Sequence, residues 1–174
     1  MRAVYEIVIK HLFSQSLRIR IFLGVTSEDD LSTIFLGKHV LLVEDSAIIA
    51  MGQELILRDF GFTITTVYRG RDAVEYVRNR ESVDIVLMDI DLGKEMDGLE
   101  AARQILAIRE LPVLFLAAQK DHRIVEQARS ISPYGYVLKG SSDFVLGEAM
   151  RMAFELSHAR RLLQQIKRDT NLCR

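Results

Sequence analysis

The chain has 174 residues, 49% of them hydrophobic and 27% charged, which is typical of a soluble globular protein of one domain with room for an extension. A single cysteine excludes a disulfide framework or a cysteine-based metal site within one chain, and no apolar run reaches the ~20 residues that span a bilayer, so we expect a cytoplasmic protein. The formal net charge is −1, but basic residues gather at both ends and leave an acidic middle, which favours a metal-binding or carboxylate-rich site over direct nucleic-acid binding.

Residues 1–37 are expected to form an N-terminal extension, because strand-like and helix-like patterns alternate only from residue 38 onward. Val4, Ile7, Val8 and Leu12 recur at helical spacing, which fits an amphipathic helix. The alternative is that residues 1–37 do not belong to the native protein, because the start codon was placed too early.

Residues 38–150 contain five short strand-like runs, each followed by a helix-like segment. Strands joined in this way are expected to be parallel, with right-handed helical crossovers. The sequence therefore predicts an α/β fold: a doubly wound five-stranded parallel sheet of flavodoxin-like order 2-1-3-4-5 with helices on both faces. The expected strands are residues 40–43, 62–68, 83–88, 113–116 and 136–138.

Residues 151–174 are expected to extend the last helix beyond this domain. Leu156, Leu162, Leu163 and Ile166 recur along it among basic residues, a pattern that fits either a solvated helix tail or a helix that binds a partner, including a second copy in a homodimer. This segment is too short for a winged helix or a helix-turn-helix module. We therefore expect no attached DNA-binding or enzymatic output domain.

Charged side chains follow three of the expected strands: Glu44 and Asp45 the first, Asp89 the third and Lys139 the fifth. In a sheet of this order, the first and third strands flank the switch point, so the three carboxylates should meet there. Carboxylates this close repel one another unless a cation compensates, and Mg²⁺, a hard ion with oxygen ligands, would do so.

An ammonium group such as that of Lys139 suits a phosphoryl oxygen. A metal on one side and an ammonium on the other suit a transferring phosphoryl group, with Asp89 as the nucleophile. Each of these residues alone also fits a loop-capping or solvated role. Their joint position at the strand ends is what favours the phosphoryl-transfer interpretation.

Over residues 38–150 the chain resembles the receiver domain of two-component response regulators, the CheY-like superfamily. The resemblance implies that Asp89 is phosphorylated by a histidine kinase or a histidine phosphotransfer protein, and that the domain signals through protein–protein contacts. It also implies that Asp45 and Asp89 bind Mg²⁺ directly, that Glu44 assists through water, that the main-chain carbonyl of Asp91 is a further ligand, and that Lys139 contacts the phosphoryl group. Such a receiver is not an enzyme in the usual sense, since it catalyses only its own phosphoryl transfer and slow dephosphorylation. The matching segments are residues 40–46, 70–73, 86–90, 96–100, 112–116 and 135–139.

Two positions depart from the family pattern. The family's switch residue after the fourth strand is normally Thr or Ser, coupled to an aromatic residue on the fifth strand, and here these are Ala117 and Tyr136. Alanine lacks the hydroxyl that would donate to the phosphoryl group, a loss of about 1.5–3 kcal/mol. The alternative function is therefore a receiver-like adaptor whose output does not depend on phosphorylation.

The second departure is Gly140, which follows Lys139 where the family usually has a proline with a cis bond. A cis bond before glycine would cost about 2.5–4 kcal/mol. We therefore expect a trans bond or a strained local backbone here.

Overall fold

The structure is a computed structural model that describes residues 35–80, 82–93, 95–118, 122–132 and 134–172, with the backbone alone at 122–125 and 170–172. Five strands form one parallel sheet of order β2-β1-β3-β4-β5, which confirms the predicted topology. The predicted N-terminal helix and Cys173 lie outside the described residues. The strands are β1 (His39–Val43), β2 (Thr63–Val67), β3 (Ile85–Asp89), β4 (Val113–Ala117) and β5 (Tyr136–Leu138). The helices are α3 (Ala47–Asp59), α4 (Gly70–Asn79), α5 (Gly98–Ile108), α6 (His122–Ile131) and α7 (Asp143–Leu172).

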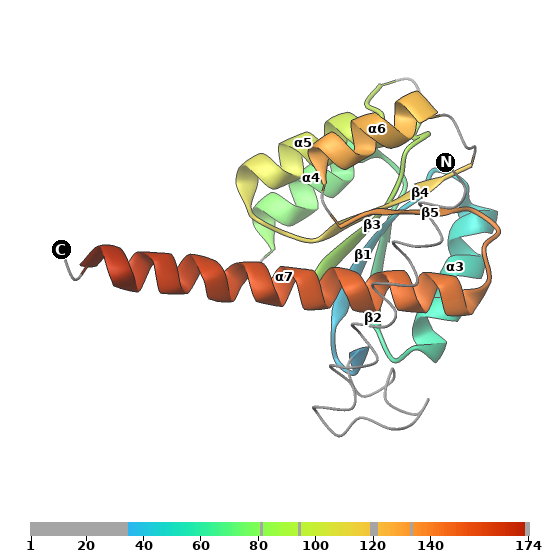
Figure 1. Ribbon diagram of the computed structural model, residues 1–174. Coiled ribbons are helices and arrows are strands. Elements are labelled where there is room, and N and C mark those ends of the chain that lie inside the picture. Colours follow the sequence, from blue (N-terminus) through green and yellow to red (C-terminus); the bar gives the residue numbers. More distant parts are fainter. Residues whose placement is uncertain (1–34, 81, 94, 119–121, 133, 173–174) are drawn as a thin grey trace. The chain divides into compact units, whose positions relative to one another are not determined.

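Helices cover both faces of the sheet, with α4, α5 and α6 over one face and α3 and α7 over the other (Figure 1). Every residue of β3 and β4 is buried, as expected for central strands that are covered on both sides. β2, at the edge of the sheet, is threonine-rich and only half buried. The buried central strands hold their carboxyl ends at fixed positions on one edge of the sheet, where the charged residues lie.

An aromatic cluster closes the opposite end of the core, and it includes a residue that precedes the expected domain start at residue 38. Phe35 is fully buried, and its ring stacks on Phe62 with 4.5 Å between ring centroids. The rings of Phe60 and Phe154 lie 6.2 and 5.9 Å from Phe35. Phe35 thus packs on α7 and on the turn between α3 and β2, and the domain limits of 38 and 150 remain a prediction.

The last helix, α7, runs without interruption from Asp143 to Leu172. Its first half packs on the sheet through Leu146, Met150 and Ala153, whereas all residues from 158 to 169 are exposed. Among the helices in the described residues, none combines the length and the apolar character needed to cross a membrane.

Candidate functional site

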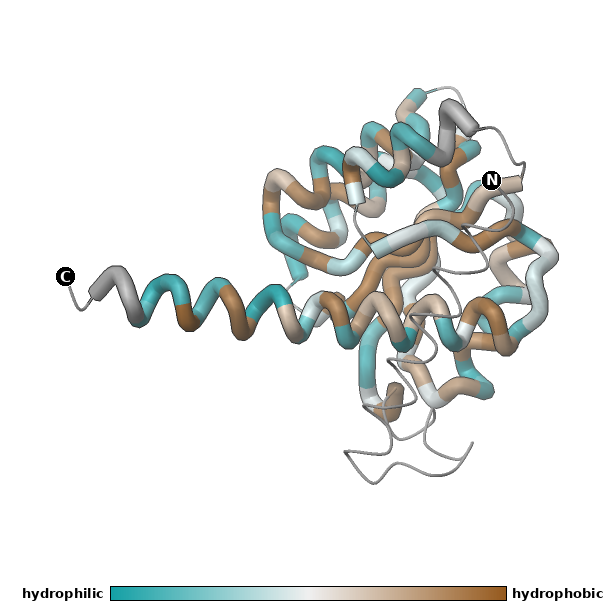
Figure 2. Tube along the Cα trace, viewed as in Figure 1, coloured by the Kyte–Doolittle hydropathy of each residue, from teal (hydrophilic) through white to brown (hydrophobic). Residues whose placement is uncertain are grey.

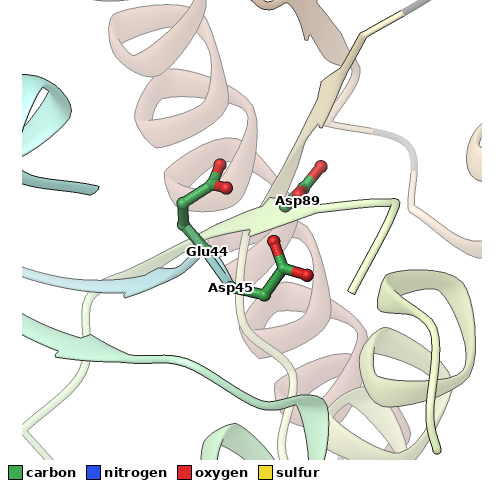
Figure 3. A group of neighbouring side chains, drawn as sticks. All are labelled: Glu44, Asp45 and Asp89. Carbon is green, nitrogen blue, oxygen red and sulfur yellow. The ribbon is translucent and has the colours of Figure 1, made fainter. Parts of the chain in front are cut away.

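Three carboxylates meet at the carboxyl edge of the sheet, where β1 and β3 lie side by side (Figure 3). Val43 pairs with Met88, so Glu44 and Asp45, which follow β1, come level with Asp89, the last residue of β3. One oxygen of each carboxylate lies within 4.8 Å of the others. Glu44 and Asp89 are each 1% exposed, whereas Asp45 is open to solvent. The structure thus brings together the carboxylates that the sequence predicted to meet.

Lys139 follows β5 and reaches this cluster from two strands away. Because neighbouring strands lie about 4.8 Å apart, its side chain must extend across the end of β4 to reach β3. Its Nζ atom lies 2.8 Å from Asp89 Oδ2 and 2.6 Å from Glu44 Oε2. A single ammonium therefore bridges the two buried carboxylates.

The ionisation of Lys139 reflects a balance between burial and these two ion pairs. Burial lowers the pKa of the ammonium, but the hydrogen bonds and charges of Asp89 and Glu44 raise it by more, so the net shift is upward. Lys139 is therefore positively charged at neutral pH. With one ammonium among three carboxylates, two negative charges in the cluster remain uncompensated.

Main-chain amides hold the remaining oxygens of the two buried carboxylates. The amide of Asp91 donates to Asp89 Oδ1 at 3.2 Å, and the amide of Ser46 donates to Glu44 Oε1 at 3.3 Å. Both carboxylates thus have fixed orientations. Asp91 itself is exposed, and its side chain is not part of the carboxylate cluster.

The donor set fits a hard divalent cation. It consists of carboxylate oxygens only, one of them from an exposed residue, and its excess negative charge favours a cation. Mg²⁺ prefers one or two carboxylates together with waters and phosphate oxygens, which this open cluster allows. Glu44, Asp45 and Asp89 are the residues that would hold such an ion.

Gly98 belongs to the segment 96–100 that matches the receiver pattern, but the sequence predicted no role for it in the site. A Cβ atom on Gly98 would lie 1.9 Å from the main-chain oxygen of Asp89, so no side chain fits there. The amide of Gly98 also donates to Ile90 O at 2.9 Å. The first turn of α5 therefore packs directly on the backbone of Asp89. The preceding residue, Asp97, caps α5 by accepting a hydrogen bond from the amide of Glu100 at 2.7 Å, a pattern typical of a helix start.

The predicted switch residues lie on neighbouring strands but do not pair with each other in the sheet. Ala117 ends β4 and is 2% exposed, and its carbonyl accepts a hydrogen bond from the amide of Lys139 at 2.8 Å. Tyr136 begins β5 and pairs with Phe115 in the sheet. Ala117 belongs to the apolar cluster under α4, α5 and α6, and the half-buried ring of Tyr136 packs against that same cluster.

The backbone after Lys139 shows which conformation the chain adopts where Gly140 replaces the family's usual proline. No cis peptide bond occurs in the described part of the chain, so the bond between Lys139 and Gly140 is trans. Gly140 has a φ of 79°, in the left-handed region that glycine adopts without strain. A trans bond followed by a left-handed glycine therefore leads the chain from Lys139 toward α7.

Comparisons with known proteins identify the domain. The family model of the response regulator receiver domain matches residues 40–151. The transcriptional regulatory protein PdtaR of Mycobacterium tuberculosis is 31% identical over 131 residues, an alignment that covers 75% of this chain and 62% of PdtaR. The chain thus spans less than two thirds of that relative.

Solved structures that are more than 25% identical to the chain include two receiver-type domains with the same fold. One is the N-terminal domain of a response regulator/sensory box/GGDEF protein from Carboxydothermus hydrogenoformans, with 41% identity, a TM-score of 0.66, and coverage of 71% of this chain and 98% of that one. The other is the receiver domain of the sensor histidine kinase PA1611 from Pseudomonas aeruginosa, solved with a magnesium ion coordinated in its active-site cleft. It has 29% identity, a TM-score of 0.61, and coverage of 67% of this chain and 98% of that one.

Proposed function

The chain belongs to the response regulator receiver domain family of two-component signalling modules, and we propose that it accepts a phosphoryl group on Asp89 from a histidine kinase or a histidine phosphotransfer protein. The observation that carries this proposal is the bridge of Lys139 between Asp89 and Glu44, beside the exposed carboxylate of Asp45. The single cysteine suits a reducing cytoplasm as the compartment.

The reaction is a displacement at phosphorus. One carboxylate oxygen of Asp89 forms the new P–O bond, while the P–N bond to the donor histidine breaks and the imidazole nitrogen leaves with the electron pair. Lys139 is close enough to Asp89, at 2.8 Å, to pair with an oxygen of the arriving phosphoryl group. The product, an aspartyl phosphate, would change the contacts that the domain makes with other proteins.

Mg²⁺ is the cofactor of this proposal. Glu44, Asp45 and Asp89 would hold it. The family resemblance implies that Glu44 acts through water and that the main-chain carbonyl of Asp91 is a further ligand. When bound, the ion supplies positive charge against the negative charge that builds on the phosphoryl oxygens during transfer. The solved PA1611 receiver, with its magnesium ion, supports this assignment.

A direct test is to incubate the full chain with acetyl phosphate, a small phosphodonor that needs no partner protein, and to measure its intact mass. We expect a gain of one phosphoryl group in the presence of Mg²⁺ and none when EDTA removes the metal. Adding Mg²⁺ back in excess should restore the gain, which serves as the control for damage by the chelator. An unmodified mass with Mg²⁺ present, confirmed with a histidine-phosphorylated donor protein, would refute the proposal.

A second candidate function follows from Ala117, which cannot donate a hydrogen bond to a phosphoryl group. Ala117 is buried beside Lys139, in the place where the family pattern has a hydroxyl. In this alternative, the domain is an adaptor that binds its partner through the surface near Tyr136 whether or not Asp89 is phosphorylated.

Ala117→Thr distinguishes the two candidates, with Ala117→Val as a control of the same shape but without the hydroxyl. Suppose that phosphorylation of the wild type changes no contacts simply because residue 117 lacks a hydroxyl. In that case, phosphorylation should slow hydrogen exchange in β5 and at the start of α7 more in the Thr variant than in the wild type or the Val variant. The reason is one added charge-assisted hydrogen bond, of about 1.5–3 kcal/mol. A large phosphorylation response in the wild type, unchanged in both variants, would instead argue against the adaptor and show that coupling takes another route.

A further inference from the structure

Helix α7 carries two apolar stripes, and only one of them packs on the sheet. The covered stripe consists of Leu146, Met150 and Ala153, which are at most 7% exposed. The second stripe lies mostly at the surface. Brown apolar segments recur along α7 as far as its outer half (Figure 2). The larger members of the second stripe are Val145 (47% exposed), Met152 (41%), Leu156 (39%), Leu163 (59%) and Ile166 (59%), and Ala149 and Ala159 complete it.

The second stripe has the spacing of a coiled-coil core. Its seven members, the residues at positions 145, 149, 152, 156, 159, 163 and 166, alternate steps of four and three residues without a break. A seven-residue repeat sustained over three heptads, with charges beside it, is the pattern of helices that wind around each other. At 1.5 Å per residue, the stripe is about 32 Å long.

We propose that this stripe pairs with the same stripe of a second copy of the chain, so that two α7 helices form a parallel coiled coil. In heptad terms, Ala149, Leu156 and Leu163 take position a, and Val145, Met152, Ala159 and Ile166 take position d. This pairing does not depend on phosphorylation of Asp89. It concerns how the domain assembles.

Charge complementarity favours a second copy in parallel orientation. Glu155 takes position g and Arg160 position e of the next heptad, and these two positions face each other across a parallel pair. An antiparallel pair would place position e against position e, where Arg160 and Lys167 are both basic. Opposite charges thus meet only in the parallel arrangement.

The contacts of these two residues within one chain are compatible with the pairing. Glu155 is an exposed partner of Arg151, and Arg151 has a second carboxylate partner in Glu148 at 2.7 Å. The guanidinium of Arg160 lies over the ring of Tyr134, 5.7 Å from its centroid, at the surface of the domain. Glu155 can therefore turn toward a partner while Arg151 keeps Glu148.

The body of the domain leaves the second stripe accessible. The residues that touch the body lie at positions b, e and f: Met150, Ala153 and Ser157 are buried, the ring of Phe154 lies 5.9 Å from that of Phe35, and Gln164 donates to Glu110 at 2.6 Å. Leu162, at position g, is 47% exposed and flanks the stripe on its other side. A partner helix therefore meets an apolar strip that the sheet does not cover.

The small residues in the stripe indicate whether two helices or more associate. Leucine at a with isoleucine at d, as at Leu163 and Ile166, by itself favours bundles of three or four helices. A core of three or four helices has more space to fill, and Ala149 and Ala159 would leave cavities in it. Two helices that approach closely at these alanines bury the stripe without cavities, so we infer a dimer.

The mass of the full chain in solution tests the pairing. By light scattering at micromolar concentration, the wild type should have the mass of two copies, and Leu163→Asp should have the mass of one. Leu163 lies outside the part of α7 that packs on the sheet, so the variant should still fold, which a cooperative thermal melt checks. The matched control is Leu55→Asp on α3, which charges another exposed leucine (66%) and should keep the mass of two copies.

A wild-type mass of one copy, of three or more copies, or a dimer that survives Leu163→Asp would each overturn the proposal. A single-copy mass would leave the N-terminal segment of the same chain, or another protein, as the partner of the stripe.

Cross-linking tests the parallel register. With Cys173 replaced by serine, Ala159→Cys should form a disulfide-linked dimer on mild oxidation, because position d faces itself across a parallel pair. His158→Cys, one residue away at position c, should not cross-link. No cross-link at position 159 in a chain that is dimeric by mass would contradict the parallel register.

Discussion

Asp89→Asn is expected to abolish phosphoryl labelling of the chain by acetyl phosphate or by a donor protein, under conditions in which the wild type is labelled. Asparagine has the shape of aspartate but no anionic oxygen, so it cannot displace a leaving group at phosphorus. Lys139 would keep Glu44 as its ion-pair partner, at 2.6 Å, and the variant should therefore fold. Intact-mass measurement reads the labelling, and a thermal melt checks the fold.

The matched control for this variant is Asp72→Asn, which neutralises an exposed carboxylate in the first turn of α4. This change should leave labelling as in the wild type, because Asp72 lies outside the carboxylate cluster. Undiminished labelling of Asp89→Asn would mean that another residue accepts the phosphoryl group, and the assignment of Asp89 would be wrong.

Gly98→Ala is expected to destabilise the domain by about 3 kcal/mol, at the upper end of the range for overpacked sites. The added Cβ would lie 1.9 Å from the main-chain oxygen of Asp89, and that oxygen belongs to the backbone of a central strand. Either α5 or the end of β3 must move, so we also expect slower phosphorylation of Asp89. Urea unfolding measures the stability, and labelling rates measure the second effect.

Gly52→Ala is the matched control, because Gly52 lies within α3 and an added Cβ there meets no atom within 4 Å. Alanine in an open helical position should stabilise the protein by about 0.5–1 kcal/mol. The two glycine variants should thus change stability in opposite directions. Equal stability of the two variants would show that the contact between α5 and Asp89 is not tight.

Most of the fold could be predicted from local patterns in the sequence. Runs such as residues 40–43 and 113–116 are apolar throughout, as strands buried on both faces must be, and the helix between each pair of strands makes a parallel sheet almost unavoidable. The strand ends differ by a residue or two from those expected: Asp89 and Ala117 close β3 and β4 rather than follow them. Hydrogen bonding between neighbouring strands decides those ends, and a run of residue types does not record it.

The candidate site was predictable for the same reason, since Glu44, Asp45, Asp89 and Lys139 each stand where a strand ends. The contacts that these residues make with one another could not be predicted from the sequence. The sequence indicated that Lys139 would contact a phosphoryl group, whereas the structure pairs it with Glu44 as well as Asp89. The close approach of Gly98 to Asp89 joins residues nine positions apart across a turn, and nothing in the residue types signals that distance.

The sequence by itself determined the order of the sheet and the edge on which the charged residues gather, because parallel strands joined by helices leave few arrangements and every strand end points the same way. Only the tertiary structure decided which side of α7 is covered. Leu146 and Met150 recur with the same spacing as Met152 and Leu156, so either stripe suited the core by periodicity alone. Packing against the sheet buried the first stripe and left the second at the surface, because one helix can turn only one face toward a sheet.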